Sequence, residues 1–224
     1  MPDFLFNQED AQNELQKYFE NNKAELTSFG NFVNQTFEAY AFAKVIKWYQ
    51  NKGYSSKIIS PIINGIETFR LKFSTRGNPN KFSYAKMTLN EETIQIRHQL
   101  RVSTTSNTNK LRFSANICCD VVILKDEDLT FFNSETAIPT HWLISFGEMK
   151  HMSAFAELVA SFIGLVHELT PTRLRKIRKR NYSSNHIAPF LYASGYMNPT
   201  AKGILETIKK RRYDIDVYSF ENPL

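Results

Sequence analysis

Two stretches decide the fold of this 224-residue chain, Ile117-Cys118-Cys119-Asp120-Val121-Val122-Ile123-Leu124 and Trp142-Leu143-Ile144-Ser145-Phe146-Gly147-Glu148-Met149-Lys150. Both are short and nearly continuously apolar, which is typical of strands that are buried on both faces of a sheet. We therefore predict strands over 117–124 and 142–149. Asp120 closes the apolar run 117–119, and an acid–x–lysine triplet closes the second stretch, so carboxylates are expected at adjacent strand ends.

Helical patterns lie on both sides of these strands along the chain. Apolar residues recur at helical spacing over 31–52 and over 153–168, and apolar residues four apart predict a first helix over 8–23. A further helix is predicted over 199–212. Gly53 supplies a C-terminal stop for the second helix, because glycine takes the left-handed conformation at little cost.

The segment between the second helix and the first apolar strand is predicted to be rich in β-structure. Residues 69–73 alternate between apolar and polar side chains, which indicates a half-buried strand. Two further strands are predicted over 82–89 and 93–102. The loop between them, 90–92, is short enough for a β-hairpin. The prediction is therefore an irregular β-rich stretch over 54–116.

Two strands are predicted near the C-terminus, over 187–193 and over 214–220. Pro189 favours an edge strand or a bulge for the first of them, because proline cannot donate to a ladder. The order is then helix, strands, helix, strand, helix, strand. This order predicts an α/β layer structure with a mixed sheet between helices. We assign one domain over 1–224, with a helical extension over 1–30 and a core over 31–220.

The composition indicates a globular chain without a membrane partner. Hydrophobic residues make up 42% and aromatic residues 13% of the sequence, and no apolar run reaches the ~18 residues of a membrane-spanning helix. The first residues lack the basic and apolar regions of a signal peptide. Cys118 and Cys119 are adjacent in a predicted strand and point to opposite faces, so no disulfide joins them. We therefore expect a cytoplasmic protein.

The net charge of +6 is concentrated near the C-terminus. Between Pro171 and Arg212 there are eleven Lys or Arg residues and one acidic residue, Glu206. The basic positions include Arg173, Arg175, Lys176, Arg178, Lys179 and Arg180, and a second cluster at Lys209, Lys210, Arg211 and Arg212. This distribution is typical of a surface that binds nucleic acid through its phosphates, although a solvated basic helix has the same composition.

The acid–x–lysine triplet Glu148-Met149-Lys150 is the only one of its kind in the sequence. Two carboxylates at adjacent strand ends can hold a divalent cation, and a neighbouring lysine can steer a water or a phosphate. The alternatives are an exposed carboxylate at Asp120 and an ordinary surface pair between Glu148 and Lys150. The cysteines and histidines do not have zinc-ligand spacing, and no phosphate-binding glycine loop is present.

These residues resemble the active-site motif of the PD-(D/E)xK nuclease superfamily. Asp120 matches the aspartate of the motif, and Glu148-Met149-Lys150 matches its acid–x–lysine. The following helix, 153–169, matches the helix that covers the sheet beside the family's active site. Glu38 best matches the glutamate on the N-terminal helix of the resolvase-like and restriction-like branches. The resemblance covers roughly residues 31–220.

The chain departs from the pattern of the family in two places. Cys119 replaces the proline that precedes the aspartate, a change that the family tolerates. The β-rich stretch before Asp120 is longer than the minimal core, so it could carry a specificity element. The resemblance therefore implies a restriction-endonuclease-like mixed sheet with a β-rich elaboration before the catalytic strands.

The resemblance also implies phosphodiester hydrolysis that depends on Mg²⁺ or Mn²⁺. Asp120, Glu148 and the carbonyl of Met149 would hold the metal, and Glu38 would bind it through a water. Lys150 would stabilise developing charge, since a lysine beside two carboxylates stays protonated. The implied function is a DNA endonuclease of restriction, phage defence or repair. A homodimer would supply one site for each strand of a duplex, and a partner protein could be required.

Two other functions are compatible with the same residues. The first is a non-catalytic module that binds nucleic acid or a protein on a nuclease-like fold. An intact set of two carboxylates and a lysine argues against it, since a binding module has no physical need for them. The second is a toxin that cleaves RNA, for which the sequence has no RRM-type or KH-type signature.

Overall fold

The computed structural model describes residues 7–20, 33–105, 115–133, 136–175 and 186–224. The α-helices in these ranges are α1 (Gln8–Glu20), α2 (Val33–Asn51), α3 (Ala156–Leu169) and α4 (Pro199–Arg211). Short 3₁₀ helices are η1 (Pro79–Lys81), η2 (Thr140–Trp142) and η3 (Pro171–Leu174). The strands are β1 (Ser55–Ile59), β2 (Ile62–Ile63), β3 (Ile66–Glu67), β4 (Tyr84–Leu89), β5 (Glu92–Ser103), β6 (Asn116–Lys125), β7 (Leu143–Lys150), β8 (Phe190–Ala193) and β9 (Asp216–Tyr218).

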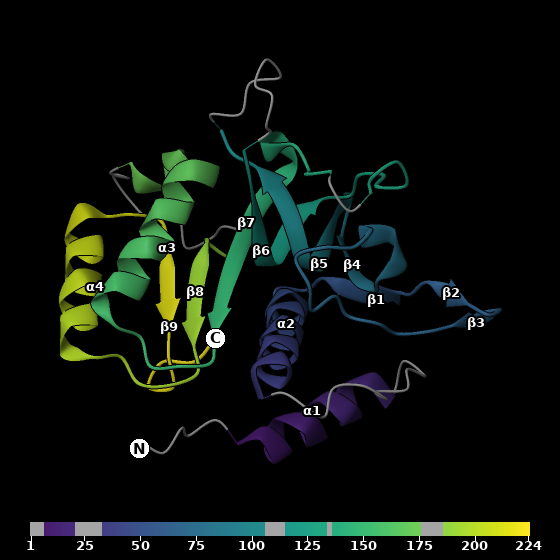
Figure 1. The fold of residues 1–224 in the computed structure, drawn as a ribbon, viewed down its shortest axis with the longest axis horizontal. Coiled ribbons are helices and arrows are strands. Elements are labelled where there is room, and N and C mark those ends of the chain that lie inside the picture. The colour runs from purple at the N-terminus through teal and green to yellow at the C-terminus, as the bar shows by residue number, and fades with distance from the viewer. Residues whose placement is uncertain (1–6, 21–32, 106–114, 134–135, 176–185) are drawn as a thin grey trace.

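Seven strands form one mixed sheet in the order β1-β4-β5-β6-β7-β8-β9. The pairs from β1 to β7 are antiparallel, whereas β7, β8 and β9 are parallel to one another. The short hairpin β2–β3 projects from the end of β1 and stands away from the sheet (Figure 1). The predicted α/β architecture with a mixed sheet flanked by helices is confirmed.

The sheet is covered on its two faces by two separate apolar clusters. One cluster contains the buried side of α2, and the other contains buried residues of α3 and α4. Along β6, Val121 and Ile123 pack in the α2 cluster, whereas Val122 and Leu124 pack in the α3 cluster. All four side chains are fully buried. This explains the continuous apolar run, because successive strand residues point to opposite faces and both faces are covered.

Gly147 lets β7 and β8 approach each other at a crowded point. A Cβ atom at this position would lie 2.2 Å from the ring of Phe190, which is fully buried. Gly147 and Phe190 are also partners in the parallel pairing of the two strands. Glycine therefore provides the space for the aromatic ring directly before Glu148.

The predictions for the second helix and the hairpin are confirmed. Gly53, two residues after the end of α2, has φ +95°, and the Tyr54 N–H donates to the carbonyl of Tyr49 over 3.1 Å. These features are those of a glycine-terminated helix. The hairpin β4–β5 has Leu89 paired with Glu92, so its turn is shorter than the predicted loop.

The predicted strand over 69–73 is wrong. Phe69 and Leu71 are buried and Arg70 is exposed, which accounts for the alternation in the sequence. The backbone of Arg70 instead bonds to Ser83: its N–H donates to the Ser83 hydroxyl over 2.8 Å, and its carbonyl accepts from the Ser83 N–H over 2.7 Å. The alternation therefore reflects burial, while the polar backbone groups are satisfied by a loop.

The edge position predicted from Pro189 is also wrong. The strand begins one residue later, at Phe190, and β8 lies between β7 and β9. Pro189 stands just before the ladder, where it lacks an N–H but its carbonyl accepts from Asp216 over 2.9 Å. A proline at this point costs the sheet no hydrogen bond.

The last helices and strands otherwise follow the prediction with shifted ends. The helix predicted from residue 153 begins at Ala156, because Ala154 forms a bridge with Met197 instead. In the parts of the chain that the structure describes, no helix is both long enough and apolar enough to cross a bilayer.

Candidate active site

Asp120 lies at the point where β6 parts from β7. The antiparallel pairing of these strands runs from Leu124↔Leu143 to Val121↔Gly147. Beyond that pair, β6 continues along β5 as far as Asn116, and β7 continues along β8. The prediction that Asp120 ends its strand is therefore wrong: the residue is in the middle of β6, and what ends there is the ladder with β7.

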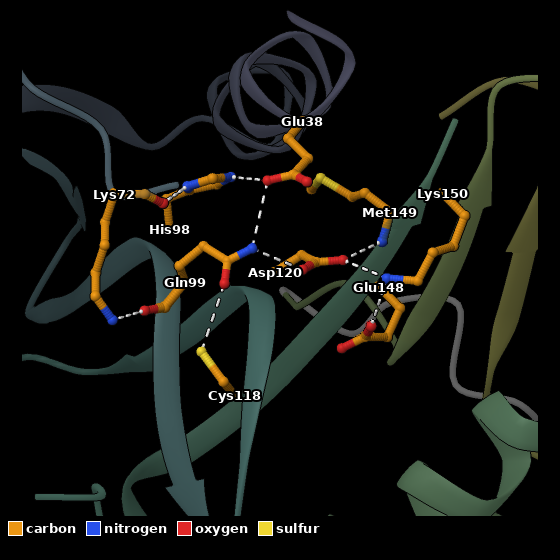
Figure 2. Close-up of polar contacts among 9 residues, drawn as sticks. All are labelled: Glu38, Lys72, His98, Gln99, Cys118, Asp120, Glu148, Met149 and Lys150. Carbon is orange, nitrogen blue, oxygen red and sulfur yellow. Dashed lines mark hydrogen bonds and ion pairs between the residues drawn. The ribbon is translucent and has the colours of Figure 1, made fainter. Parts of the chain in front are cut away.

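The parting of the strands brings the predicted aspartate, glutamate and lysine together (Figure 2). Lys150 Nζ lies 3.0 Å from Asp120 Oδ2 and 3.1 Å from Glu148 Oε2. The Met149 N–H also donates to Asp120 Oδ2, over 2.8 Å. The side chains of Asp120 and Glu148 are each 10% exposed and that of Lys150 is 37% exposed, so the lysine is the most exposed member of the cluster.

The protonation of the cluster depends on its burial. Burial and the charge of Asp120 raise the pKa of the Glu148 carboxyl to about 7, although Lys150 opposes this shift. Burial disfavours the charged form of Lys150, but the two carboxylates outweigh it and raise the pKa of the ammonium above its ordinary value. Lys150 is therefore a cation near neutral pH, whereas Glu148 exchanges a proton there.

One oxygen of this cluster is buried without a partner. Among the residues that the structure describes, nothing forms a hydrogen bond with Glu148 Oε1. Its sister oxygen, Oε2, is the one that contacts Lys150. A buried carboxylate oxygen without a donor is costly, so this atom is available for a cation or a donor from outside the chain.

Gln99 joins this cluster to the helix α2. Its amide donates to Asp120 Oδ1 over 2.8 Å and to Glu38 Oε2 over 3.3 Å. The residue has φ +52°, which places it in the left-handed region that side-chain-bearing residues rarely adopt. The β5–β6 ladder passes from His98↔Val121 to Leu100↔Cys119, with Gln99 between these pairs.

The left-handed backbone coincides with a change in which face the side chains of β5 cover. His98 packs against the ring of Phe42 on α2, with ring centroids 5.9 Å apart. Leu100, two residues later, belongs to the opposite cluster that contains α3. The irregularity at Gln99 separates the two faces, and it turns the amide toward Asp120 and Glu38.

Lys72 and His98 hold this irregular backbone in place. Lys72 is buried, and its ammonium donates to the carbonyl of Gln99 over 2.6 Å. Burial lowers the pKa of this lysine. The Lys72 carbonyl in turn contacts Nδ1 of His98, and because a carbonyl can only accept, Nδ1 carries the hydrogen. The segment mistaken for a strand thus supports the site.

The structure also places the predicted Glu38 beside the cluster. Its Oε2 lies 3.3 Å from Nε2 of His98, whose side chain is fully buried, and accepts from Gln99 (Figure 2). Glu38 therefore reaches Asp120 through one glutamine side chain. Sequence analysis did not identify Gln99, His98 or Lys72, because single polar residues in a β-rich segment have no recognisable pattern.

Arg173 and Arg175, the two described members of the basic group predicted to bind nucleic acid, are not part of this cluster. Because β7, β8 and β9 are parallel, the helices α3 and α4 both return to the end of the sheet opposite Lys150 (Figure 1). Arg173 and Arg175 follow α3 at that end, and Arg173 is paired with Asp214. The remaining positions of this group, Lys176, Arg178, Lys179 and Arg180, lie outside the described residues.

The described residues supply two close carboxylates rather than a complete set of protein metal ligands. Within the described ranges, no group of three or more His, Cys, Asp or Glu side chains is placed to hold a metal. Mg²⁺ is commonly bound by one or two carboxylates and completed by water and substrate phosphate. Asp120 and Glu148, with the unpartnered Oε1, fit this mode of binding. The Met149 carbonyl as a further ligand stays a prediction.

Comparison with protein-family models, curated proteins and solved structures finds no match to this chain. The function must therefore be argued from the geometry of the cluster itself.

Proposed function

We propose that this chain is a metal-dependent nuclease of the PD-(D/E)xK type, with a restriction-endonuclease-like fold, that hydrolyses phosphodiester bonds in DNA. The observation that carries the proposal is the convergence of Asp120, Glu148 and Lys150 where two central strands part. Two carboxylates and an ammonium group at one point match what metal-assisted phosphodiester hydrolysis requires. The wider contexts, restriction, phage defence or repair, belong to the same proposal.

The role of the carboxylates follows from their burial. Asp120 and Glu148 would hold Mg²⁺ or Mn²⁺, which would supply Lewis-acid stabilisation of the phosphate and a more acidic water. Glu148 must lose its proton before it can bind a cation, and its pKa of about 7 places that loss close to neutrality. Metal binding is therefore expected to strengthen as the pH rises through about 7.

The role of Lys150 is to place positive charge beside the scissile phosphate. Its raised pKa keeps the ammonium protonated, so it cannot serve as a general base near neutral pH. A fixed cation in a largely buried position stabilises charge that develops on the phosphate oxygens and the leaving group. Gln99 would hold the Asp120 carboxylate in position through its amide, and Glu38 would in turn fix that amide.

A binding module without catalysis is the competing function. The structure of the cluster argues against it on energetic grounds, because burial raises the pKa of Glu148 and its ionised form destabilises the fold. A pure binding surface gains nothing from such a group. An RNA substrate differs only in the polymer, so the same assay distinguishes it from DNA.

Lys150→Ala is the substitution that tests the proposed nuclease. Wild-type protein should nick supercoiled plasmid in Mg²⁺ or Mn²⁺ and lose this activity in EDTA, and Lys150→Ala should be slower by about 100–1,000-fold. The loss is expected because the cation that stabilises the transition state is gone. Single-stranded DNA and RNA assayed in parallel would identify the preferred polymer.

The result that would refute the nuclease is equally clear. If neither form cleaves any of the three substrates, while both bind DNA with the same affinity and salt dependence, the protein is a binding module. Cleavage by the alanine variant at the wild-type rate would show that the activity arises elsewhere.

Gln99→Ala tests the positioning of Asp120 by its neighbour. We expect Mn²⁺ affinity to fall by about 10–100-fold, because second-shell partners that orient a ligand have effects of this size. Isothermal titration calorimetry measures this affinity without substrate. Cys118→Ser is the matched control: its thiol lies 3.5 Å from the Gln99 side-chain oxygen, which does not contact Asp120. Equal loss in both variants would indicate general disruption.

A further inference from the structure

A second polar site lies on β5, two residues before Gln99. Arg97 is 6% exposed, and its guanidinium lies over the ring of Tyr84, 3.8 Å from the centroid. Its Nε donates to Gln95 over 2.7 Å, and Nη1 has a long contact of 3.4 Å with the carbonyl of Pro79. Within the described parts of the chain, no carboxylate forms an ion pair with Arg97.

A charged guanidinium is costly to bury unless it is paired. Burial accordingly lowers the pKa of Arg97 to about 10. The nearby carboxylate of Asp126 is already engaged by Lys86 at 2.6 Å and by the Gln95 amide at 2.8 Å. The Nη2 group of Arg97 is left without a hydrogen bond to any described residue, although it can donate twice.

Arg97 lines a cavity of about 410 Å³. The other residues that line it include Phe82, Tyr84, Gln95 and the acidic loop 126–130. Cavities of this size accept small organic ligands, and a few fixed polar groups in them determine which ligand binds.

Glu127 of the acidic loop lines the same cavity, and its backbone carbonyl accepts from the Gln95 amide over 2.9 Å. Glu127 is half-buried, and its carboxylate forms no hydrogen bond or ion pair with the residues described. Asp128, by contrast, accepts from the N–H and the hydroxyl of Thr130 over 2.8 and 2.9 Å. The residues that line the cavity thus include one with an unused strong donor, Arg97, and one with an unused strong acceptor, Glu127.

We propose that this cavity binds a guanine base. Guanine has two adjacent acceptors, O6 and N7, that suit an arginine, and two adjacent donors, N1–H and the 2-amino group, that suit a carboxylate. Its flat ring also fits a cavity with aromatic walls. Phosphate is a poor ligand here, because Asp126, Glu127 and Asp128 line the same cavity and would repel an anion.

Other bases match this pair of groups less well. Adenine offers a donor beside its N7 acceptor, so it cannot accept two hydrogen bonds from one arginine at that edge. Thymine lacks the paired donors that a carboxylate accepts from. The base could belong to a free nucleoside or to a nucleic acid strand, and the chemistry of recognition is the same in both.

This site does not depend on the proposed cleavage of phosphodiester bonds. Gln99 faces Glu38 and Asp120, whereas Arg97 lines the cavity beside the loop 126–130. Binding can therefore be measured in EDTA, where a metal-dependent nuclease is inactive. A failure of the guanine site and a failure of the nuclease would then be seen in separate experiments.

The first measurement is calorimetric titration of the wild-type protein with guanosine, adenosine, inosine and 7-deazaguanosine. Guanosine should bind at least tenfold more tightly than each of the others, because each lacks one of the required groups. Inosine lacks the 2-amino group and so tests the contact with the carboxylate. 7-Deazaguanosine lacks N7 and so tests the contact with Arg97. Removing N7 from the ligand tests the contact without a substitution of Arg97, a buried residue on which folding could depend.

Glu127→Gln is the protein variant that completes the test. It should lower the affinity for guanosine by about tenfold and lower the affinity for inosine less, because inosine keeps N1–H but lacks the amino group that the carboxylate also accepts from. Asp128→Asn is the matched control, since Asp128 is already occupied by Thr130, and it should bind guanosine like the wild type.

A second arm identifies the source of the base. Labelled thymine oligonucleotides with one central guanine, adenine or 7-deazaguanine are titrated in EDTA by fluorescence anisotropy. Guanine selectivity only in the oligonucleotides indicates a base within a strand, and selectivity for guanosine indicates a free nucleoside; both support the site. Equal binding of guanine and adenine in both arms, or selectivity that survives Glu127→Gln, would overturn it.

Discussion

Asp120→Asn should lower metal-dependent DNA cleavage by about a thousandfold or more. The substitution keeps the size of the side chain but removes the charge that would attract the cation. Metal ions contribute several kcal/mol to transition-state stabilisation, and ~4 kcal/mol corresponds to about three orders of magnitude in rate. The measurement is the initial rate of plasmid nicking at saturating Mn²⁺.

The large effect is expected because Asp120 is the hub of the cluster. Its two oxygens accept from Gln99, from the Met149 N–H and from Lys150. Asparagine offers one acceptor oxygen and places an NH₂ group against one of these donors. Glu157→Gln is the control, because it removes one exposed carboxylate from the nearby helix α3. Asp120→Asn with more than a tenth of wild-type activity would exclude a metal ligand at this position.

Glu148→Gln should abolish metal binding and at the same time stabilise the metal-free protein above neutral pH. The Glu148 carboxyl has a pKa of about 7 in the fold and an ordinary value of 4.5. A carboxyl with a raised pKa contributes stability that is complete below its unfolded pKa and is lost as the pH rises through its folded pKa. The wild type therefore loses stability between about pH 4.5 and pH 7, whereas the glutamine variant does not.

The difference should reach on the order of 1–2 kcal/mol at about pH 8, because one pKa unit corresponds to ~1.36 kcal/mol and the contact with Lys150 is weakened. At about pH 4 the two proteins should have nearly equal free energies of unfolding. Urea unfolding at both pH values, with and without Mn²⁺, measures these quantities. Mn²⁺ should stabilise the wild type only. A variant that is less stable at both pH values would show that the buried carboxylate is satisfied in the fold.

Much of the architecture could be predicted from the sequence, because the strongest patterns arise from burial. The apolar runs of β6 and β7 and the helical spacing in α2 and α3 each reflect packing against a neighbouring layer. The triplet that ends at Lys150 was recognisable since its spacing along one strand directly determines which side chains lie together. These parts depend on local geometry alone.

The errors came from features that depend on the rest of the fold. Residues 69–73 have the alternation of a strand, but their backbone bonds to Ser83 and to His98. The apolar run 117–119 stops at Asp120, which suggested the end of a strand. In the structure only the pairing of β6 with β7 ends there, and the pairing of β6 with β5 continues. Gln99 could not be found at all, because its role comes from a backbone conformation that no sequence pattern indicates.

The left-handed backbone at Gln99 has a consequence for how this chain can change. A non-glycine residue in this conformation costs on the order of 1–3 kcal/mol, and glycine would relieve it. Glycine, however, has no amide to reach Asp120 and Glu38. Selection for heat resistance alone would thus favour losing the side chain, while selection for the site would retain it. Evolution toward greater stability and evolution toward greater activity pull this position in opposite directions.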